Sequence, residues 1–505
     1  MKFSTNSLRI CGTTALCVVG MISALSGKSQ KLPSLSTSPP SSATIAQKSA
    51  SPKQEAGPDN FSPGLMQQLE AIKTAALSDD YAYQRLAHLT ENIGARPAGS
   101  AGARAAVEYV AAEMRSLGLE VHLEELKVRH WVRGTETAEL VTGPEFAAGI
   151  QQRVVVTALG GSTSTGNEGI TADVVVVNDF DQLKTLGRDK VVGKFVLFNK
   201  KFDKQKAESG LAFAAYRENV GYRETGPKAA ADLGAVAALV RSIGGAEYRL
   251  PHAGDSEAAG IPAASITAED ADLIAHLAAQ GPVRMHLTLT PQRQPNETTY
   301  NVIGDLRGSE HPEQIVIVSG HLDSWDLGTG ALDDGAGVVM AMETAQLLQQ
   351  LHLRPKRTLR VIAWMDEETD GAGSNRYKEE HHSELPNHVA AIESDAGAAH
   401  PFGFFTRMSG PAAEALRPVR SVLVSTGVTT FQESLHPPGV TDIAPMAEEG
   451  VPILGPMQGS RTYYDYHHTA ADTLDKVVPS ELRENAAAMA VMAFALTNMK
   501  DPLPR

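Results

Sequence analysis

The stretch that most constrains this chain is an apolar strand that runs directly into a histidine. Residues 315–318 read Ile-Val-Ile-Val, and such a continuous apolar run is typical of a strand buried on both faces. The run stops at Gly320, and His321 follows at once. Open α/β sheets form their sites at the carboxyl ends of the strands. We therefore expect His321 to lie at the end of a central strand, on the edge of the sheet where sites form.

A loop with paired acids follows this strand. Asp323 lies two residues after His321, and a glycine-containing segment then leads to Asp333 and Asp334. Imidazole and carboxylate groups are suitable ligands for zinc, so the sequence of this loop predicts a metal-binding site. A polar surface loop is the alternative interpretation. A helix is expected next, because apolar residues recur at helical spacing: Val338, Met342, Ala345 and Leu348.

Composition limits the classes of function. The chain has 505 residues with 42% hydrophobic and 21% charged residues, which is ordinary for a globular protein of two or more domains. A net charge of −14 argues against nucleic acid as a partner. The only cysteines are Cys11 and Cys17, so a metal site in the body of the protein must use His, Asp and Glu.

The N-terminal segment resembles a secretory signal peptide. Lys2 and Arg9 precede an apolar run, and we assign residues 1–26 to the signal. Residues 27–59 are rich in Ser and Pro and predict a disordered tether. We expect an exported protein, secreted or periplasmic, with no stable membrane span if the signal is cleaved. An uncleaved segment would instead tether the protein to a membrane.

The remaining chain divides into three segments. Residues 60–130 and 296–498 alternate strand and helix patterns. They predict two parts of one domain of the α/β class, with a mostly parallel sheet and helices on both faces. The sequence pattern of residues 131–295 is different, with short strand-like runs separated by Gly-rich turns. They predict an inserted domain that contributes structure and a wall of a substrate cleft. The strands expected in the main sheet are 301–306, 314–318, 357–364, 388–393 and 451–454.

Three further strand ends carry groups that can bind metal. Glu367 and Glu368 follow one apolar run, Asp395 follows another, and His467 with His468 lies near the end of the chain. Each group alone has an ordinary explanation, as a helix start, a cap or a surface residue. Because several strands of one sheet end in such groups, we predict that they form a single site.

The combined order of these motifs resembles a known family. The strings H-x-D, D-D-G, E-E, S-D and H-T-x-x-D-T are similar to those of the co-catalytic di-zinc exopeptidases, the family of the bacterial secreted leucyl aminopeptidases. The longer strings are most similar to its carboxypeptidase Q branch, also called plasma glutamate carboxypeptidase. The resemblance covers about residues 60–495. It implies that residues 131–295 are the protease-associated insert common in these enzymes.

The resemblance implies a ligand set for two Zn²⁺ ions. His321 and Asp395 would hold one ion, Glu368 and His468 the other, and Asp333 would bridge both. Such a pair of ions lowers the pKa of a bound water, which is the nucleophile of the reaction.

Further roles are carried over in the same way. Glu367 would be the general base that takes the water proton and passes it to the leaving amine. Asp323 would orient His321 from behind, and the peptide bond between Asp333 and Asp334 would be cis. His467 stands where some relatives carry a tyrosine that stabilises the oxyanion. Two roles stay open for His467, oxyanion donor or support for the neighbouring ligand.

The predicted function is an exopeptidase that hydrolyses short peptides or dipeptides. Two alternatives share the scaffold: a metal-free receptor-like or binding ectodomain, and a glutaminyl cyclase-like acyl transferase. The resemblance also implies a homodimer.

The sequence leaves the choice between amino-terminal and carboxy-terminal specificity open. Glu393, Asp326 or Asp442 would serve a free amine, and Arg461 or Arg376 a free carboxylate.

Overall fold

The computed structural model describes residues 60–258 and 260–505. The predicted signal peptide and tether, residues 1–26 and 27–59, lie outside this part of the chain. Among the helices of the described residues, none combines the length and the apolar character that a bilayer span requires.

The larger half of the structure is an eight-stranded sheet with the order β1-β10-β12-β11-β13-β16-β14-β15. Strands β12, β11, β13 and β16 run parallel to one another at its centre, and the flanking β10 and β14 are antiparallel to them. The predicted α/β class is confirmed, and every predicted strand of this sheet is present. The bounds are β1 (Glu120–Val132), β10 (Gln292–Leu306), β11 (His311–His321), β12 (Arg357–Trp364), β13 (His388–Glu393), β14 (Pro401–Arg407), β15 (Thr430–Glu433) and β16 (Ile453–Gln458).

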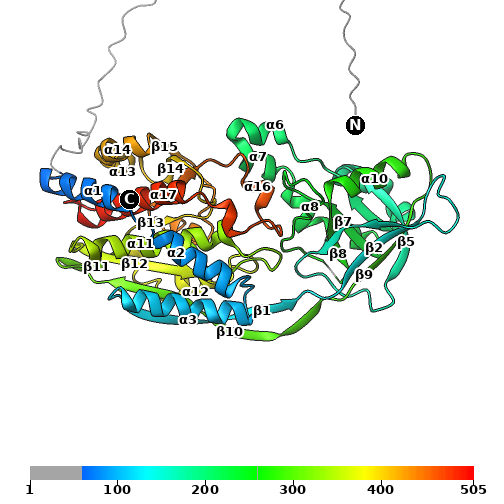
Figure 1. The fold of residues 1–505 in the computed structure, drawn as a ribbon, viewed down its shortest axis with the longest axis horizontal. Helices are drawn as coiled ribbons and strands as arrows, with labels where there is room; N and C mark the ends of the chain where they lie inside the picture. Colours follow the sequence, from blue (N-terminus) through cyan, green and yellow to red (C-terminus); the bar gives the residue numbers. More distant parts are fainter. Residues whose placement is uncertain (1–59, 259) are drawn as a thin grey trace, which may run out of the picture. The chain divides into compact units, whose positions relative to one another are not determined.

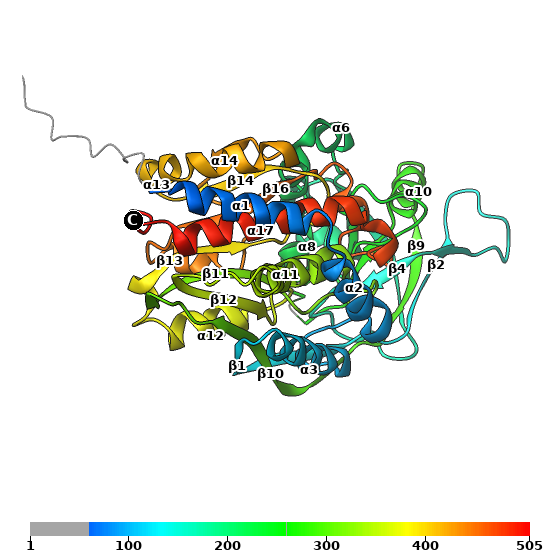
Figure 2. The same ribbon diagram turned by 60° about the vertical axis from the view of Figure 1, so that its left-hand side comes forward.

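Helices cover both faces of this sheet, and β11 shows why. Val316 and Val318 point into one apolar core, which they share with α11 and α17. Ile315 and Ile317 point into a second core on the opposite face, with Tyr377 of α12. Figure 2 shows α1 and α17 side by side on the first face. The helices of this half are α1 (Pro63–Ala76), α2 (Tyr81–Ala87), α3 (Ala101–Ser116), α11 (Ala336–Gln350), α12 (Ala372–Glu380), α13 (Gly410–Ala415), α14 (Arg417–Leu423), α15 (Ala444–Ala447), α16 (Tyr463–Tyr466) and α17 (Pro479–Asn498).

A second eight-stranded sheet is built between β1 and β10, with the order β3-β2-β9-β5-β6-β7-β8-β4. The chain enters it from β1 and returns through β10, and these two strands pair antiparallel. Both sheets belong to one compact unit, and the assignment of residues 131–295 to a protease-associated domain stays a prediction. The bounds are β2 (Glu136–Thr142), β3 (Gln152–Val154), β4 (Val156–Ala158), β5 (Ile170–Val177), β6 (Phe195–Phe198), β7 (Ala237–Arg241), β8 (Ala263–Ile266) and β9 (Arg284–Leu289).

The helices of this second part reach the first sheet through α7. Figure 1 shows α7 beside α16, and Tyr216 of α7 stacks on Tyr464 of α16 with ring centroids 4.2 Å apart. This aromatic contact brings the second part against the loop that carries His467 and His468. The helices are α4 (Phe180–Leu186), α5 (Arg188–Val191), α6 (Lys204–Lys206), α7 (Ala212–Arg217), α8 (Val220–Glu224), α9 (Gly226–Asp232) and α10 (Ala268–Ala278).

The end of β11 is tightly packed. A Cβ on Gly320 would lie 2.5 Å from Asp334 Oδ2 and 2.6 Å from the backbone N of Val338. Only glycine fits there, so the start of α11 lies directly against the strand that ends in His321.

Candidate metal centre

The structure brings the five predicted ligands together, with Asp333 between the other four. His321 ends β11, and its Nε2 lies 3.1 Å from Asp333 Oδ1 and 3.6 Å from Asp395 Oδ1. On the other side, His468 Nε2 lies 3.2 Å from Asp333 Oδ2 and 2.9 Å from Glu368 Oε2. The two oxygens of Asp333 therefore face two separate groups of ligand atoms.

These residues fit divalent cations. Asp333 Oδ2 and Glu368 Oε1 are buried and accept no hydrogen bond from the described residues. A buried carboxylate oxygen without a donor is costly, and a cation is the partner that would compensate it. Burial raises the pKa of Glu368 to about 8 and that of Asp395 to about 7. Metal binding at this centre would therefore displace protons near neutral pH.

Asp323 fixes the turn that carries the two glutamates. Its Oδ1 accepts hydrogen bonds from the backbone N of Asp366 at 2.8 Å and of Glu367 at 3.2 Å, and its Oδ2 from Glu368 N at 3.3 Å. His321 Nδ1 lies 3.1 Å from the backbone oxygen of Asp323 but 3.9 Å from its carboxylate. The backbone carbonyl of Asp323 therefore orients His321, whereas its carboxylate fixes the backbone of the two glutamates.

The loop of Asp333 is held in a similar way by Asp472, which belongs to the H-T-x-x-D-T motif. Asp472 Oδ1 accepts from the backbone N of Leu332 at 2.7 Å, and its Oδ2 accepts from Asp333 N at 3.2 Å. The peptide bond that follows, between Asp333 and Asp334, is cis. Both oxygens of Asp334 also accept backbone N–H groups, from His321 at 3.0 Å and Gly337 at 3.0 Å.

Arg96 supports the same loop and was not predicted. Its guanidinium is fully buried and donates to the carbonyls of Leu322 at 2.7 Å, Thr329 at 2.6 Å and Gly330 at 2.9 Å. Burial lowers its pKa to about 10. A lone arginine in the turn-rich stretch G-A-R-P is a sequence signal that could have indicated this structural role.

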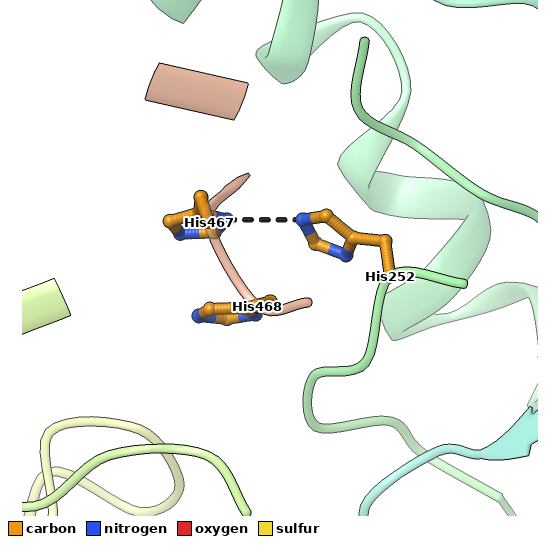
Figure 3. A group of neighbouring side chains, drawn as sticks. All are labelled: His252, His467 and His468. Carbon is orange, nitrogen blue, oxygen red and sulfur yellow. Dashed lines mark hydrogen bonds between the residues drawn. The ribbon is translucent and has the colours of Figure 1, made fainter. Parts of the chain in front are cut away.

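The second part of the chain also contributes polar groups to the centre. His252 Nε2 lies 3.0 Å from His467 Nδ1, a contact drawn in Figure 3. Arg223 Nη1 lies 3.2 Å from His468 Nδ1. His467 Nε2 in turn lies 3.4 Å from Asp333 Oδ2. No spacing pattern in the sequence pointed to His252 or Arg223, because each is a lone residue in a loop or short helix.

A cavity of about 640 Å³ opens on the centre. Glu367 and the ligands Asp333, Glu368, Asp395 and His468 lie on one side of it. The other side is formed by the second part of the chain, with Phe213, Tyr216, Arg217 and Arg223 among the lining residues.

The residues proposed for substrate ends lie elsewhere. Asp326 pairs with Arg133 at 2.7 Å, and Glu393 and Asp442 are buried away from the cavity lining. Arg376 pairs with Glu380 at 2.7 Å.

Arg461 also fails to reach the cavity. It donates to the Glu208 carbonyl at 2.9 Å and is not among the lining residues.

Comparison with known proteins agrees with this geometry. Residues 301–493 match the profile of Peptidase family M28. Carboxypeptidase Q from Bos taurus is 35% identical over 429 residues, which cover 84% of this chain and 86% of that protein. The chain belongs to peptidase family M28. It is therefore a metallopeptidase, similar to carboxypeptidase Q.

Solved structures show the same fold for this M28 peptidase. A peptidase M28 precursor from Shewanella amazonensis is 34% identical with a TM-score of 0.81, covering 87% of this chain and 98% of that chain. A zinc aminopeptidase from Bacillus subtilis is 21% identical with a TM-score of 0.60, covering 84% of this chain and 98% of that one. The second similarity concerns the fold alone.

Proposed function

We propose that this M28 peptidase is an exported exopeptidase that uses two zinc ions to hydrolyse short peptides or dipeptides. The observation that carries the proposal is the two-sided arrangement about Asp333. Each of its oxygens meets a histidine, and a second carboxylate lies beside each histidine. Imidazole and carboxylate ligands suit zinc, and the similar aminopeptidase from Bacillus subtilis is a zinc enzyme. The proposed ligands are His321, Asp333, Glu368, Asp395 and His468.

Glu367 is the proposed general base. It lines the cavity next to the ligand Glu368, and the hydrogen bond from its backbone N to Asp323 fixes its place in the turn. Bound zinc lowers the pKa of a water and polarises the substrate carbonyl. The Glu367 carboxylate takes the proton of the attacking water and passes it to the nitrogen of the leaving amine.

We further propose that substrates are recognised by a free terminal carboxylate. Arg217 lines the cavity, and its side chain is exposed. Guanidinium groups match carboxylates in geometry and charge. The name of the similar carboxypeptidase Q agrees with an attack at the carboxyl end. Arg217 thus replaces Arg461 and Arg376 as the proposed carboxylate-binding residue.

The test is a Glu367→Gln variant measured beside the wild type. Loss of the base should lower kcat for dipeptides by about 10²–10⁴-fold, while two zinc ions per chain remain by elemental mass spectrometry. Glu379→Gln is the matched control, because Glu379 is exposed in α12. Wild type that holds no metal and hydrolyses no peptide would instead support a binding ectodomain. Export and homodimerisation stay predictions from the sequence.

A further inference from the structure

His252 reaches from the second part of the chain to the metal centre. It lies between β7 and β8, and its side chain is buried. Its ring meets His467, which stacks on His468 with centroids 3.7 Å apart and an interplanar angle of 10°. Figure 3 shows His252 pointing at the edge of His467 from the opposite side of the loop. The three rings form a chain that leads from the second sheet to a proposed metal ligand.

The surroundings of His467 decide which of its nitrogens carries the proton. Its Nε2 lies 3.4 Å from Asp333 Oδ2. The two atoms make no hydrogen bond, but a carboxylate oxygen at this distance repels a nitrogen lone pair and therefore favours an N–H at that position. In the neutral ring, Nδ1 then has the lone pair and must accept the hydrogen bond from His252.

The surroundings of His252 agree with this assignment. A neutral His252 that donates from Nε2 leaves its Nδ1 as a bare acceptor. His252 Nδ1 is buried and makes no hydrogen bond within the described residues, and a buried N–H without an acceptor is the less favourable arrangement. The nearby carbonyl of Ala253 already faces His468 Nδ1 at 3.3 Å and Arg223 Nη1 at 3.4 Å.

The ring of His252 is held in place by its own part of the chain. Its backbone N donates to Ser242 Oγ at 3.0 Å, and that hydroxyl donates to the Leu250 carbonyl at 3.2 Å. Tyr216 of α7 packs beside the ring with centroids 5.7 Å apart. His252 therefore approaches His467 from a fixed direction.

We propose that His252 is a positioning residue that holds His467 with its Nε2–H directed at the metal centre. The proposal rests on the proposed function, because the N–H of His467 then serves the reaction in the cavity that it lines. A donor placed there stabilises the negative charge that develops on the substrate carbonyl oxygen. The second part of the chain would thus complete the catalytic site as well as enclose it.

Two variants of His252 test this role in the zinc-loaded, full-length protein. His252→Leu removes the donor and should lower kcat about 10–100-fold, with KM changed less than about 3-fold. His252→Gln should recover kcat to within about 5-fold of wild type, since its amide N–H can replace Nε2–H. His382→Leu, at an exposed position, is the control and should match wild type. Zinc content should be unchanged in all four proteins.

A spectroscopic measurement reports the tautomer directly. Long-range ¹H–¹⁵N correlation spectra of protein labelled with ¹⁵N-histidine should show the proton of His467 on Nε2 in wild type and in His252→Gln. The resonances are assigned by their loss in a His467→Asn variant. In His252→Leu, the preference for Nε2 should weaken.

Each contrary result overturns the proposal. A proton on Nδ1 of His467 in wild type contradicts it even if His252→Leu fails to fold. Full kcat in His252→Leu contradicts it as well, and the proposed function survives if Glu367→Gln is still inactive. Failure of both the wild-type hydrolysis and the metal binding would instead reject the proposed function.

Discussion

Among single residues, the aspartates and glutamates of this centre differ in whether their carboxylate oxygens accept hydrogen bonds. Asp334 and Asp472 accept backbone N–H groups at both oxygens, and Asp323 does the same toward the glutamate turn. Asp333 Oδ2 and Glu368 Oε1 are buried without a donor. The first group can therefore shape loops, whereas the second group is left available for cations. Residue type alone would not separate the two groups.

Arg217 provides a prediction about specificity. Arg217→Met should raise KM for a dipeptide with a free carboxylate by about 10–100-fold, because a charge-assisted pair contributes roughly 1.5–3 kcal/mol. The same variant should leave kcat/KM for the matching dipeptide amide within about 2-fold of wild type. Both values come from initial-rate kinetics on the paired substrates.

The control for Arg217 is Arg420→Met, at an exposed position of α14. It should change neither substrate. An equal loss of affinity for the amide and the free acid would show that Arg217 shapes the cavity rather than binding the carboxylate.

Among the helices and strands, the sequence predicts the elements that have a periodic apolar pattern. It does not predict the residues that reach the centre only because the second sheet packs against the first part of the chain. The apolar runs of β11 and β12 end at His321 and before Glu367, so both strands and the positions of these polar residues after them could be predicted from the pattern. His252 and Arg223 reach the centre only because the second sheet docks through Tyr216 and neighbouring residues. No local sequence pattern predicts this contact between the two parts of the chain.

The contact between α11 and α2 gives a prediction about pH. Glu343 of α11 accepts a hydrogen bond from Ala82 N at 3.1 Å, and burial raises its pKa to about 8. The folded state therefore binds a proton that the unfolded state releases above about pH 4.5. Stability from this group is present below that pH and is lost as the pH rises toward 8.

Glu343→Gln should remove this loss, because the amide oxygen still accepts from Ala82 without a charge. The free energy of unfolding of the variant, relative to wild type, should increase by roughly 3 kcal/mol between pH 5 and pH 8. Guanidinium unfolding at the two pH values measures it. The exposed Glu108→Gln serves as control, and parallel pH curves for wild type and Glu343→Gln would contradict the assignment.

In the molecule as a whole, the cavity lies between the parts of the chain that form the two sheets, and both parts line it. One wall carries the strand ends of the first sheet, and the other carries α7 and α8 of the second part. The proposed ligands span residues 321–468, from β11 to the loop after α16. Metal binding would therefore link elements that are distant in sequence, so its effect should appear in global stability as well as in activity.

Removal of metal by chelation tests this link. A ligand that binds only the folded state adds about 4 kcal/mol when its free concentration is about a thousand times Kd. Each site should contribute on this order, so the apoprotein should unfold several degrees lower in calorimetry. Titration with zinc should restore the transition temperature over two equivalents, because Asp333 faces two groups of ligands. Asp395→Asn should retain one tight site, and the exposed Asp189→Asn should retain both. Full recovery at one equivalent would mean that the two sides of Asp333 hold a single ion.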